Sequence, residues 1–530
     1  MNKIKIRLKM ILVLIISLFF ISNIVISNFF VSEGFIGGKD DKILTSAILP
    51  ENSSLKEWNM TWGGSEVDQG LKVIVDSSNN TYVVGCTSSF GNGEFDVVVI
   101  KFNSVGEIQW NMTWGGNVSE CGYDIIMDLF GDIYITGVTT SFGKGDWDIV
   151  VIKYNKMGEQ LWNRTWGGTN KDLVHKIIID SSNNAYIIGN TYSFGNGESD
   201  IFVVKYNSVG DQLWNRTWGR SDFDTDVDAI LDPFNHLYVS GVIGKEEIND
   251  MFGHTFIVGG DAFLVKFNQL GEELWNKTWG ESSHILIGDC GHNLALDSSN
   301  NVYITGEYGV YYQPEIYSPR GGDIFLFKYN SSGKLLWNRF WEGPIFHTLR
   351  GLYYDVVVDG SDNIYVLGAV EKKQYFSNIT LRKYNNIGEC LWNKIWANYE
   401  MNWGFEIEFD SNDDIYILGI TESGYDHDIA ILHYNQTGKI LWDEIWNEST
   451  YEWGHDMYID TYNNIFIVGC IYIEEDNYDM VLIKFFYIRV GIENEIPGDI
   501  IFLIMILSLV SLIIIIFSLK KRINKPINTI

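Results

Sequence analysis

The sequence is poor in positive charge. It contains 38 lysines and arginines against 68 aspartates and glutamates, which gives a net charge of −30. The two ends, residues 1–34 and 498–530, each carry a net +3, so residues 35–497 carry −36. A surface this acidic repels nucleic acid and anionic lipid over long distances. The sequence therefore argues against a nucleic-acid partner for the middle of the chain.

Cysteines and catalytic motifs are also scarce. The five cysteines are widely spaced, odd in number and form no Cys-x-x-Cys pair, which argues against a disulfide framework or a cysteine metal site. We interpret Cys86 and Cys470, at matching repeat positions, as small buried apolar residues. No Gly-x-Ser-x-Gly, His-Glu-x-x-His or phosphate-binding loop occurs. We therefore predict that the chain is not an enzyme and holds no cofactor beyond a cation such as calcium.

Aromatic residues and glycine, by contrast, are abundant, with 19 Trp, 29 Tyr, 30 Phe and 52 Gly. A motif Trp-x-x-x-Trp recurs through the chain, and it begins at Trp58, Trp110, Trp162, Trp214, Trp275, Trp337, Trp392 and Trp442. Recurrence at a period of roughly fifty residues indicates a repeat architecture.

Each repeat contains four predicted strands, which we name A to D. In the repeat at 172–218, strand A ends at Asp180, B carries Tyr186, C ends at Asn207 and D carries the two Trp. Turn residues separate the strands, and no segment has a helical period, so the fold class is all-β. Four-stranded antiparallel units repeated eight times predict an eight-bladed β-propeller over residues 55–490.

The two ends of the repeat region predict how the ring closes. The chain begins with a lone D strand, Leu55–Trp62, and its last repeat has strands A, B and C but no D strand. We predict that the N-terminal strand completes the eighth blade, which hides sheet edges that would otherwise pair with other chains. Seven blades plus a stray unit is the alternative.

The repeat unit, quoted from Trp162 to Trp214, runs Trp-x-x-x-Trp-Gly-Gly … Asp-x-x-x-Asn-x-Tyr-x-x-Gly-x-Thr-x-Ser … Lys-Tyr-Asn-x-x-Gly-x-x-x-Trp. It resembles the SBBP-type β-propeller repeats of bacteria and archaea over about residues 55–485. The last four units lack Gly-Gly after the second Trp. The resemblance implies the propeller fold and no particular reaction.

Hydrophobic segments flank the repeats. Residues 1–34 have a basic start and an apolar run, which indicates a signal peptide or an uncleaved signal anchor. A linker at 35–54 leads into the propeller, and a second at 491–498 leads out of it. Residues 499–519 are long and apolar enough for a transmembrane helix, with a buried core helix as the alternative. The basic tail 520–530 is expected in the cytoplasm, so we predict a plasma-membrane protein with its propeller outside the cell.

Loop lengths predict a binding face. The A–B and C–D connections keep one length, whereas the B–C loops lengthen at Gly244–Gly260 and Glu307–Gly322, and the D–A loops lengthen at Gly280–Gly288 and Glu342–Gly351. B–C and D–A loops leave an up-and-down blade on one face, and loops on a rigid scaffold collect binding residues. The candidate ligand contacts are Phe252, His254, Phe256, Tyr308, Tyr311, Tyr312, Tyr317, Arg320, His347 and Arg350. Packing of the long loops onto the blades is the alternative role.

An acidic residue recurs eight positions before the last residue of strand A. The six acidic members, which we consider as metal ligands, are Asp68, Glu120, Asp172, Asp224, Asp289 and Glu452. Clustered carboxylates suit a hard cation such as calcium. The alternative is that each carboxylate accepts N–H bonds within its own D–A turn.

Twelve Asn-x-Ser/Thr sequons lie in the middle of the chain, and five belong to the Trp motif: Asn59, Asn111, Asn163, Asn215 and Asn276. In an exported protein these are candidate glycosylation sites. The sequence thus favours a cell-surface binding or adhesion module for an extracellular protein or glycan. The alternatives are an acidic surface-coat protein without a specific ligand, and a quinoprotein-like enzyme, because the spacing from Asn155 to Trp162 resembles the docking motif of that class.

Overall fold

The computed structural model describes residues 53–488, with gaps at 250–254, 281–286, 314–317, 321, 344–353, 374–375, 398–400, 424–425, 450 and 475–476. Residues 54–486 form one compact unit. Among the described residues, no helix is long and apolar enough to cross a bilayer. The two predicted terminal helices lie outside the described residues.

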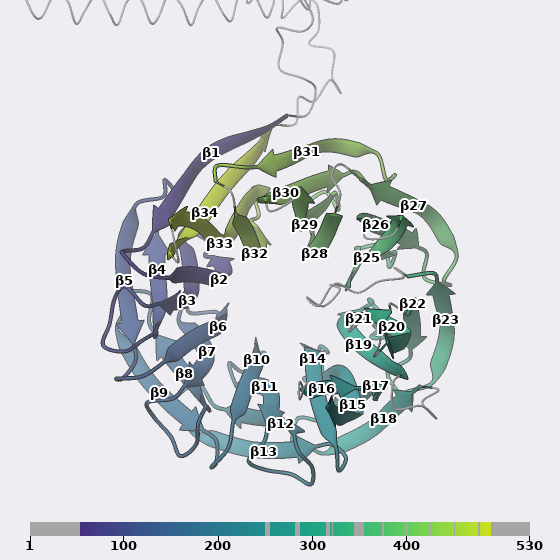
Figure 1. The fold of residues 1–530 in the computed structure, drawn as a ribbon, viewed down its shortest axis with the longest axis horizontal. Coiled ribbons are helices and arrows are strands. Elements are labelled where there is room, and N and C mark those ends of the chain that lie inside the picture. The colour runs from purple at the N-terminus through teal and green to yellow at the C-terminus, as the bar shows by residue number, and fades with distance from the viewer. Residues whose placement is uncertain are drawn as a thin grey trace, which may run out of the picture. The chain divides into compact units, whose positions relative to one another are not determined.

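Eight antiparallel sheets form the blades of a ring, with strand A innermost and strand D outermost (Figure 1). Blade 1 has β2 (Asp68–Val75), β3 (Thr81–Thr87), β4 (Asp96–Phe102) and β5 (Ile108–Trp114). Blade 2 has β6 (Glu120–Met127), β7 (Ile133–Thr139), β8 (Asp148–Tyr154) and β9 (Gln160–Trp166). Blade 3 has β10 (Asp172–Ile179), β11 (Ala185–Thr191), β12 (Asp200–Tyr206) and β13 (Gln212–Trp218).

Blades 4 and 5 each contain an additional short strand. Blade 4 has β14 (Phe223–Leu231), β15 (Leu237–Asn249), β17 (Asp261–Phe267) and β18 (Glu273–Trp279), with β16 (Thr255–Val258) paired to β15. Blade 5 has β19 (Ile287–Leu296), β20 (Val302–Gln313), β22 (Asp323–Tyr329) and β23 (Leu335–Trp341), with β21 (Ser318–Arg320) paired to β20.

The remaining blades return to four strands. Blade 6 has β24 (Asp355–Val358), β25 (Ile364–Lys373), β26 (Phe376–Tyr384) and β27 (Cys390–Trp396). Blade 7 has β28 (Met401–Phe409), β29 (Ile415–Ser423), β30 (Asp426–Tyr434) and β31 (Ile440–Trp446). Blade 8 combines β32 (Glu452–Ile459), β33 (Asn464–Glu474) and β34 (Asn477–Ile488) with β1 (Ser53–Trp62). The predicted eight blades and the closure by the N-terminal strand are both confirmed.

The A–B turns explain one of the recurring motifs. In blade 3, Asp180 Oδ1 accepts the N–H groups of Ser182 and Asn184, both at 2.9 Å, and Asn183 has a φ of +60°. Six other blades place Asn or Asp in the same left-handed conformation, which these short polar residues tolerate better than other L-residues. The fixed length of this connection is therefore the length of a hairpin turn.

A buried polar group ties strands A, B and C together inside a blade. Lys205 Nζ of β12 lies 3.0 Å from Asp180 Oδ2 and 2.6 Å from the hydroxyl of Tyr186 on β11. The same Asp–Tyr–Lys arrangement recurs in blades 2, 4 and 5. A buried charge is tolerated when it is paired and hydrogen-bonded, so the strand-C lysine of the repeat is a core residue.

The Trp motif joins neighbouring blades. Trp162 Nε1 on β9 donates to the carbonyl of Ser208 in the next blade at 3.1 Å, and Arg164 Nε donates to the carbonyl of Gly210 at 2.7 Å. Indoles at the same position in five other blades make the same bond. Six of the eight outer strands are thereby hydrogen-bonded to the C–D turn of the neighbouring blade.

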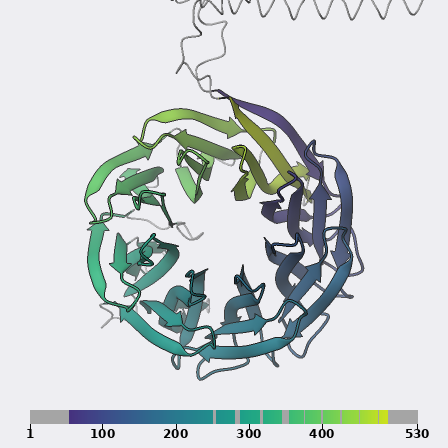
Figure 2. The ribbon, with the colours of Figure 1, turned by 180° about the vertical axis from the view of Figure 1, so that it is seen from behind.

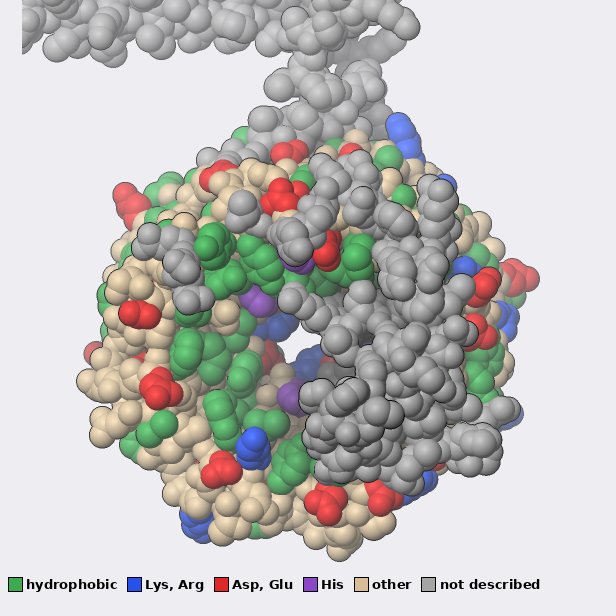
Figure 3. All heavy atoms as spheres, viewed as in Figure 1, with side chains coloured by type: hydrophobic (Ala, Val, Ile, Leu, Met, Phe, Trp, Pro, Cys, Tyr) green, Lys and Arg blue, Asp and Glu red, His purple; other side chains and the backbone are tan. Residues whose placement is uncertain are grey.

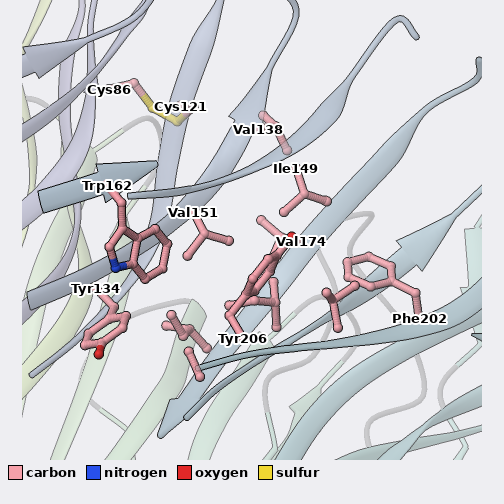
Figure 4. Packing of buried hydrophobic residues seen from close by; sticks show 14 residues of the cluster. Cys86, Cys121, Tyr134, Val138, Ile149, Val151, Trp162, Val174, Phe202 and Tyr206 are labelled. Carbon is pink, nitrogen blue, oxygen red and sulfur yellow. A yellow bond between two sulfur atoms is a disulfide. The ribbon is translucent and has the colours of Figure 1, made fainter. Parts of the chain in front are cut away.

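Cys86 and Cys121 correct the cysteine interpretation, because they form a disulfide between β3 of blade 1 and β6 of blade 2 (Figure 4). Strand B of one blade lies beside strand A of the next, which brings the two Cα atoms to 4.8 Å despite 35 residues of separation. Cys470 occupies the Cys86 position in blade 8, but Gln69 stands at the Cys121 position of the blade that follows. Cys470 is a free, buried thiol, as predicted.

Replacing both Cys86 and Cys121 by serine is expected to lower the free energy of unfolding by roughly 2–4 kcal/mol, because the open chain regains loop entropy. Denaturant unfolding of the oxidised protein against the variant measures this difference. The exposed free thiol of Cys390 supplies the control, since Cys390→Ser should leave the midpoint unchanged. Equal midpoints for the parent and the double variant would show that the disulfide does not stabilise the ring.

Candidate binding face

The sheet order places all B–C and D–A connections on one face of the ring, which we call the BC face. All blades are meanders of antiparallel strands, so alternate connections emerge on opposite faces. On the BC face, β15 and β20 run past the ends of their blades and pair with β16 and β21. These two hairpins, at 246–258 and 311–320, are called the arms, and their strands lie on neighbouring blades (Figure 1).

Five of the ten candidate contacts belong to the described residues, and these lie on or beside the arms. Phe256 pairs with Ile248 in the blade 4 arm. In the blade 5 arm, Tyr311 pairs with Arg320 and Tyr312 pairs with Pro319. Tyr308 lies at the base of the second arm, where its ring centroid is 5.3 Å from that of Phe340, so it packs on its own blade. The other candidates lie outside the described residues: Phe252, His254, Tyr317, His347 and Arg350.

Blades 1 to 3 have a different, more regular BC face. Their B–C loops each carry one half-exposed phenylalanine, Phe90, Phe142 and Phe194. Each ring packs against the last Trp of its neighbouring D strand, with centroids 4.9–5.2 Å apart. Figure 3 shows hydrophobic side chains around the opening on the side of these blades. The aromatic residues of the short loops are thus largely engaged with the scaffold.

The opposite face of the ring, whose ribbon is viewed in Figure 2, carries exposed apolar residues that sequence reasoning missed. Five C–D turns expose an apolar side chain just before the turn glycine, and these are Val105, Met157, Val209, Leu270 and Ile387, at 60–68% exposure. Phe130 and Phe234 add exposed rings in A–B turns. The signal was present in the repeat, because an apolar residue at the tip of a polar turn has no packing role.

The recurring acidic residues are buried in their own D–A turns. In blade 3, Asp172 Oδ2 accepts the N–H of Gly168 at 2.8 Å and the hydroxyl of Ser193 at 2.8 Å, while Oδ1 accepts the hydroxyl of Thr191. Asp68 and Glu120 make corresponding bonds. This geometry favours the turn role over a ring of cation ligands around the opening.

These carboxylates also meet a second carboxylate from the preceding blade. At the junction of blades 2 and 3, a Cβ added to Gly167 would lie 1.8 Å from Asp148 Oδ1 and 2.7 Å from Asp172 Oδ2. Four further junctions repeat the arrangement, at Gly63, Gly115, Gly219 and Gly280. The first glycine after the second Trp is therefore required by the carboxylate pair. Asn378 and Asn402 stand at the pair positions between blades 6 and 7, where Ala397 replaces the glycine.

A second ring of charged residues, which sequence reasoning also missed, lies on the innermost strands. It occupies the position four residues before the last residue of strand A: Lys72, Asp124, Lys176, Asp228, Asn293, Asp355, Glu406 and Asp456. A β-bulge next to this position in most blades turns the side chain toward the next blade. A charged residue in the same place of seven of the eight apolar strands, with Asn293 as the exception, was the available signal.

This inner ring crosses the blade junctions through hydrogen bonds. Asp124 Oδ2 accepts the N–H of Ile177 at 2.9 Å, and Asp456 Oδ2 accepts the N–H of Val73 at 2.8 Å while its Oδ1 pairs with Lys72. Lys176 pairs with Asp228. The ring therefore holds adjacent blades in register around the opening.

Carboxylates outnumber lysines in the inner ring, and the excess lies on blades 6 to 8. Burial raises the pKa of Asp355 and, with help from Asp456, that of Glu406. Burial, followed by repulsion from Asp355 and Asp456, raises the pKa of the neighbouring Glu408 to about 7. An opening lined in this way attracts cations.

The five motif sequons lie on the outer D strands. Asn111, Asn215 and Asn276 are exposed, and Asn59 and Asn163 are half-buried. Strand D is the outermost strand of its blade, so a glycan there would point away from the ring. Glycosylation of these residues stays a prediction.

Comparisons with known proteins agree with the repeat fold. No family model matches the chain. It is 19% identical over 501 residues to an uncharacterized WD repeat-containing protein of Acanthamoeba polyphaga mimivirus, covering 68% of this chain and 36% of that protein. It is 22% identical over 178 residues to the regulatory protein FlaEY of Caulobacter vibrioides, covering 30% of this chain and 19% of that protein. The chain thus spans about a third and a fifth of the lengths of these relatives.

Among solved structures, the chain is similar to Sqt1 from Chaetomium thermophilum, with a TM-score of 0.47, 8% identity and coverage of 82% of this chain and 99% of that one. It is also similar to the WD40 domain of SCAP from fission yeast, with a TM-score of 0.43, 9% identity and coverage of 82% and 98%. The β-propeller domain of the Trilobed protease from Pyrococcus furiosus matches with a TM-score of 0.36, 9% identity and coverage of 72% and 100%.

Proposed function

We propose that the chain is an extracellular interaction module that binds a partner through the two arms on its BC face. The observation that carries the proposal is the one-sided extension of the ring. Among the described residues, only blades 4 and 5 add a strand to the four of the blade. A two-stranded ribbon contributes little stability by itself, so a protein that served only as a coat would gain nothing from the arms.

The strand edges of the arms favour a protein partner over a glycan. In the part of the chain that the structure describes, β16 pairs only with β15, and β21 pairs only with β20. An exposed edge offers backbone N–H and C=O groups to an extended peptide, and side chains at alternate positions supply specificity. Tyr311, Arg320 and Phe256 on the arm strands belong to residue types suited to such contacts.

Several features support display outside the cell. The basic flanks of both hydrophobic terminal segments lie at the outer ends of the chain, which favours an outside location for the middle. The disulfide of Cys86 and Cys121 suits an oxidising compartment, and a net charge of −36 on residues 35–497 keeps such a domain soluble. The proposal therefore includes anchoring by residues 499–519, in keeping with the resemblance to SBBP-type repeats.

Shortening both arms is expected to abolish binding to cells that display the partner, and leave folding intact. In the arm variant, Gly244–Gly260 and Gly309–Gly322 are each replaced by the B–C loop of blade 1, Ser88–Phe95. The labelled full-length protein in nanodiscs is titrated onto intact cells, and we expect at least a tenfold loss of affinity. Protease treatment of the cells should remove binding, and glycosidase treatment should not.

The matched control changes the opposite face. Phe130 and Phe234 are 75% and 60% exposed there, so replacing both by serine should leave binding unchanged. Loss of binding in this control but not in the arm variant would move the site to the opposite face. Absence of saturable binding by the parent protein would favour the coat-protein alternative.

A further inference from the structure

The junction of blades 7 and 8 departs from the regular carboxylate pair described above. In a regular blade, the first carboxylate of strand C is held by its own B–C loop, since Asp148 Oδ2 accepts the N–H groups of Lys144 and Gly145 at 2.8 and 2.9 Å. Blades 1 and 3 repeat both bonds. In these three blades the loop N–H groups thus stabilise one carboxylate of the pair by hydrogen bonds.

In blade 7 this loop is replaced by a tight hairpin. Strands β29 and β30 continue their pairing to Ser423 and Asp426, beyond the point at which the pairing of β7 with β8 ends, at Thr139 and Asp148. Asp428 nevertheless keeps the carboxylate at the Asp148 position and is 5% exposed. Its pair partner across the junction is Glu452 of β32, which is fully buried. This junction therefore keeps both carboxylates of the regular pair in a shortened B–C connection.

The same hairpin adds a third carboxylate. Asp426 stands two residues before Asp428, where blade 2 has the exposed Asp146. One oxygen each of Asp426, Asp428 and Glu452 lies within 4.8 Å of the other two. The glycine of the regular junctions is replaced by Asn447, whose side chain hydrogen-bonds Asp428. Three acidic groups and an amide thus converge where the five regular junctions have two acidic groups.

One oxygen of each carboxylate is buried without a hydrogen-bond partner: Asp426 Oδ1, Asp428 Oδ1 and Glu452 Oε2. The other oxygen of Glu452 accepts the N–H groups of Glu448 and Ser449. None of the ion pairs among the described residues involves these three carboxylates. Leaving buried anionic oxygens without donors is costly, so the cluster calls for a positive charge.

The electrostatics agree with this geometry. Burial, followed by repulsion from Asp426 and Glu452, raises the pKa of Asp428 to about 6. Burial also raises the pKa of Glu452, with Asp426 adding to the effect. At neutral pH the three groups therefore repel one another in a poorly solvated space, and a bound cation relieves that repulsion.

We propose that Asp426, Asp428 and Glu452 bind a divalent cation of the calcium class and thereby join blade 7 to the closing blade 8. Calcium takes six to eight oxygen ligands at about 2.3–2.6 Å, so two of its ligand oxygens can stand up to about 5 Å apart. The separations in the cluster fit that range. An all-oxygen ligand set also suits calcium better than zinc or copper.

Calcium is expected to raise the melting temperature of the chelator-treated full-length protein by several degrees at pH 7.5, with saturation in the micromolar to millimolar range. Terbium, which replaces calcium, should give saturable luminescence excited through Trp453, the neighbour of Glu452. Calcium should displace it, and magnesium should do so at least tenfold less effectively.

Asp426→Asn separates a cation site from a merely structural cluster. This variant removes one repelling charge, so it should melt at or above the temperature of the calcium-free parent while losing the response to calcium and terbium. The matched control is Asp146→Asn in blade 2, which should keep both responses. A parent without saturable terbium luminescence or calcium stabilisation would overturn the proposal, as would an unchanged response in Asp426→Asn.

Discussion

Deletion of β1, residues 53–62, is expected to unfold the propeller. The deletion leaves blade 8 with three strands and exposes the edge of β34. It also removes Trp58, Met60 and Trp62, which pack against the apolar cluster shared by blades 8 and 1. Burial of three large apolar side chains contributes up to about 5–9 kcal/mol, which matches the whole stability of a typical domain, about 5–15 kcal/mol. Circular dichroism and size-exclusion chromatography should report loss of the fold and aggregation.

The control for this deletion is restoration of the missing strand in trans. A synthetic peptide spanning residues 53–66 should recover the monomeric, cooperatively melting protein, because it pairs with the open edge of β34 in blade 8. A β1-deleted chain that stays monomeric, with the melting temperature of the parent, would show that the ring closes without β1.

Asp180→Ala is expected to lower the free energy of unfolding by about 3–5 kcal/mol. The substitution leaves the ammonium of Lys205 buried without its counter-ion, and breaking a buried pair from one side costs about that much. It also removes the acceptor that holds the N–H groups of Ser182 and Asn184. Urea unfolding of the variant measures the loss.

Two further measurements distinguish the loss of the ion pair with Lys205 from the loss of the hydrogen bonds in the A–B turn. The double variant Asp180→Ala with Lys205→Met should recover part of the lost stability, since the stranded charge is gone. Burial tends to raise the pKa of Asp180, but hydrogen bonds from Asn184 and Lys205 outweigh it and lower the pKa below its ordinary value. This contribution to stability is therefore present above about pH 4 and is lost as the pH falls through the lowered pKa. A double variant no more stable than Asp180→Ala would assign the loss to the turn alone.

The blade count, the strand order and the closure by β1 were predictable because each depends on a local repeated pattern. The Trp motif marks strand D in every copy. The last repeat has no D strand, and the additional D strand at the start of the repeat region, Leu55–Trp62, takes its place. Turn chemistry is equally local, as the left-handed Asn183 shows. The position of the arms followed from loop length alone, although their strands β16 and β21 did not, because their short segments lack a clear alternation.

Features that depend on which blades are neighbours were harder to predict. The Cys86–Cys121 disulfide joins strand B of one repeat to strand A of the next, and spacing along the chain gives no sign that these strands of adjacent blades touch. The inner ring depends on β-bulges that turn Asp124 and its counterparts toward the next blade. The carboxylate pairs depend on the same contact, and the glycine that follows the second Trp, as at Gly167, marks their position in the sequence.

Hydrogen–deuterium exchange of β1 tests the central claim, a ring of eight blades closed by the N-terminal strand, most directly. If β1 completes blade 8, the amides of Ser53–Trp62 that pair with β34 should exchange as slowly as those of β32 and β33, because one cooperative opening exposes them all. If the ring closes with seven blades and β1 is a stray strand, its amides will exchange within seconds while those of the other blades stay protected.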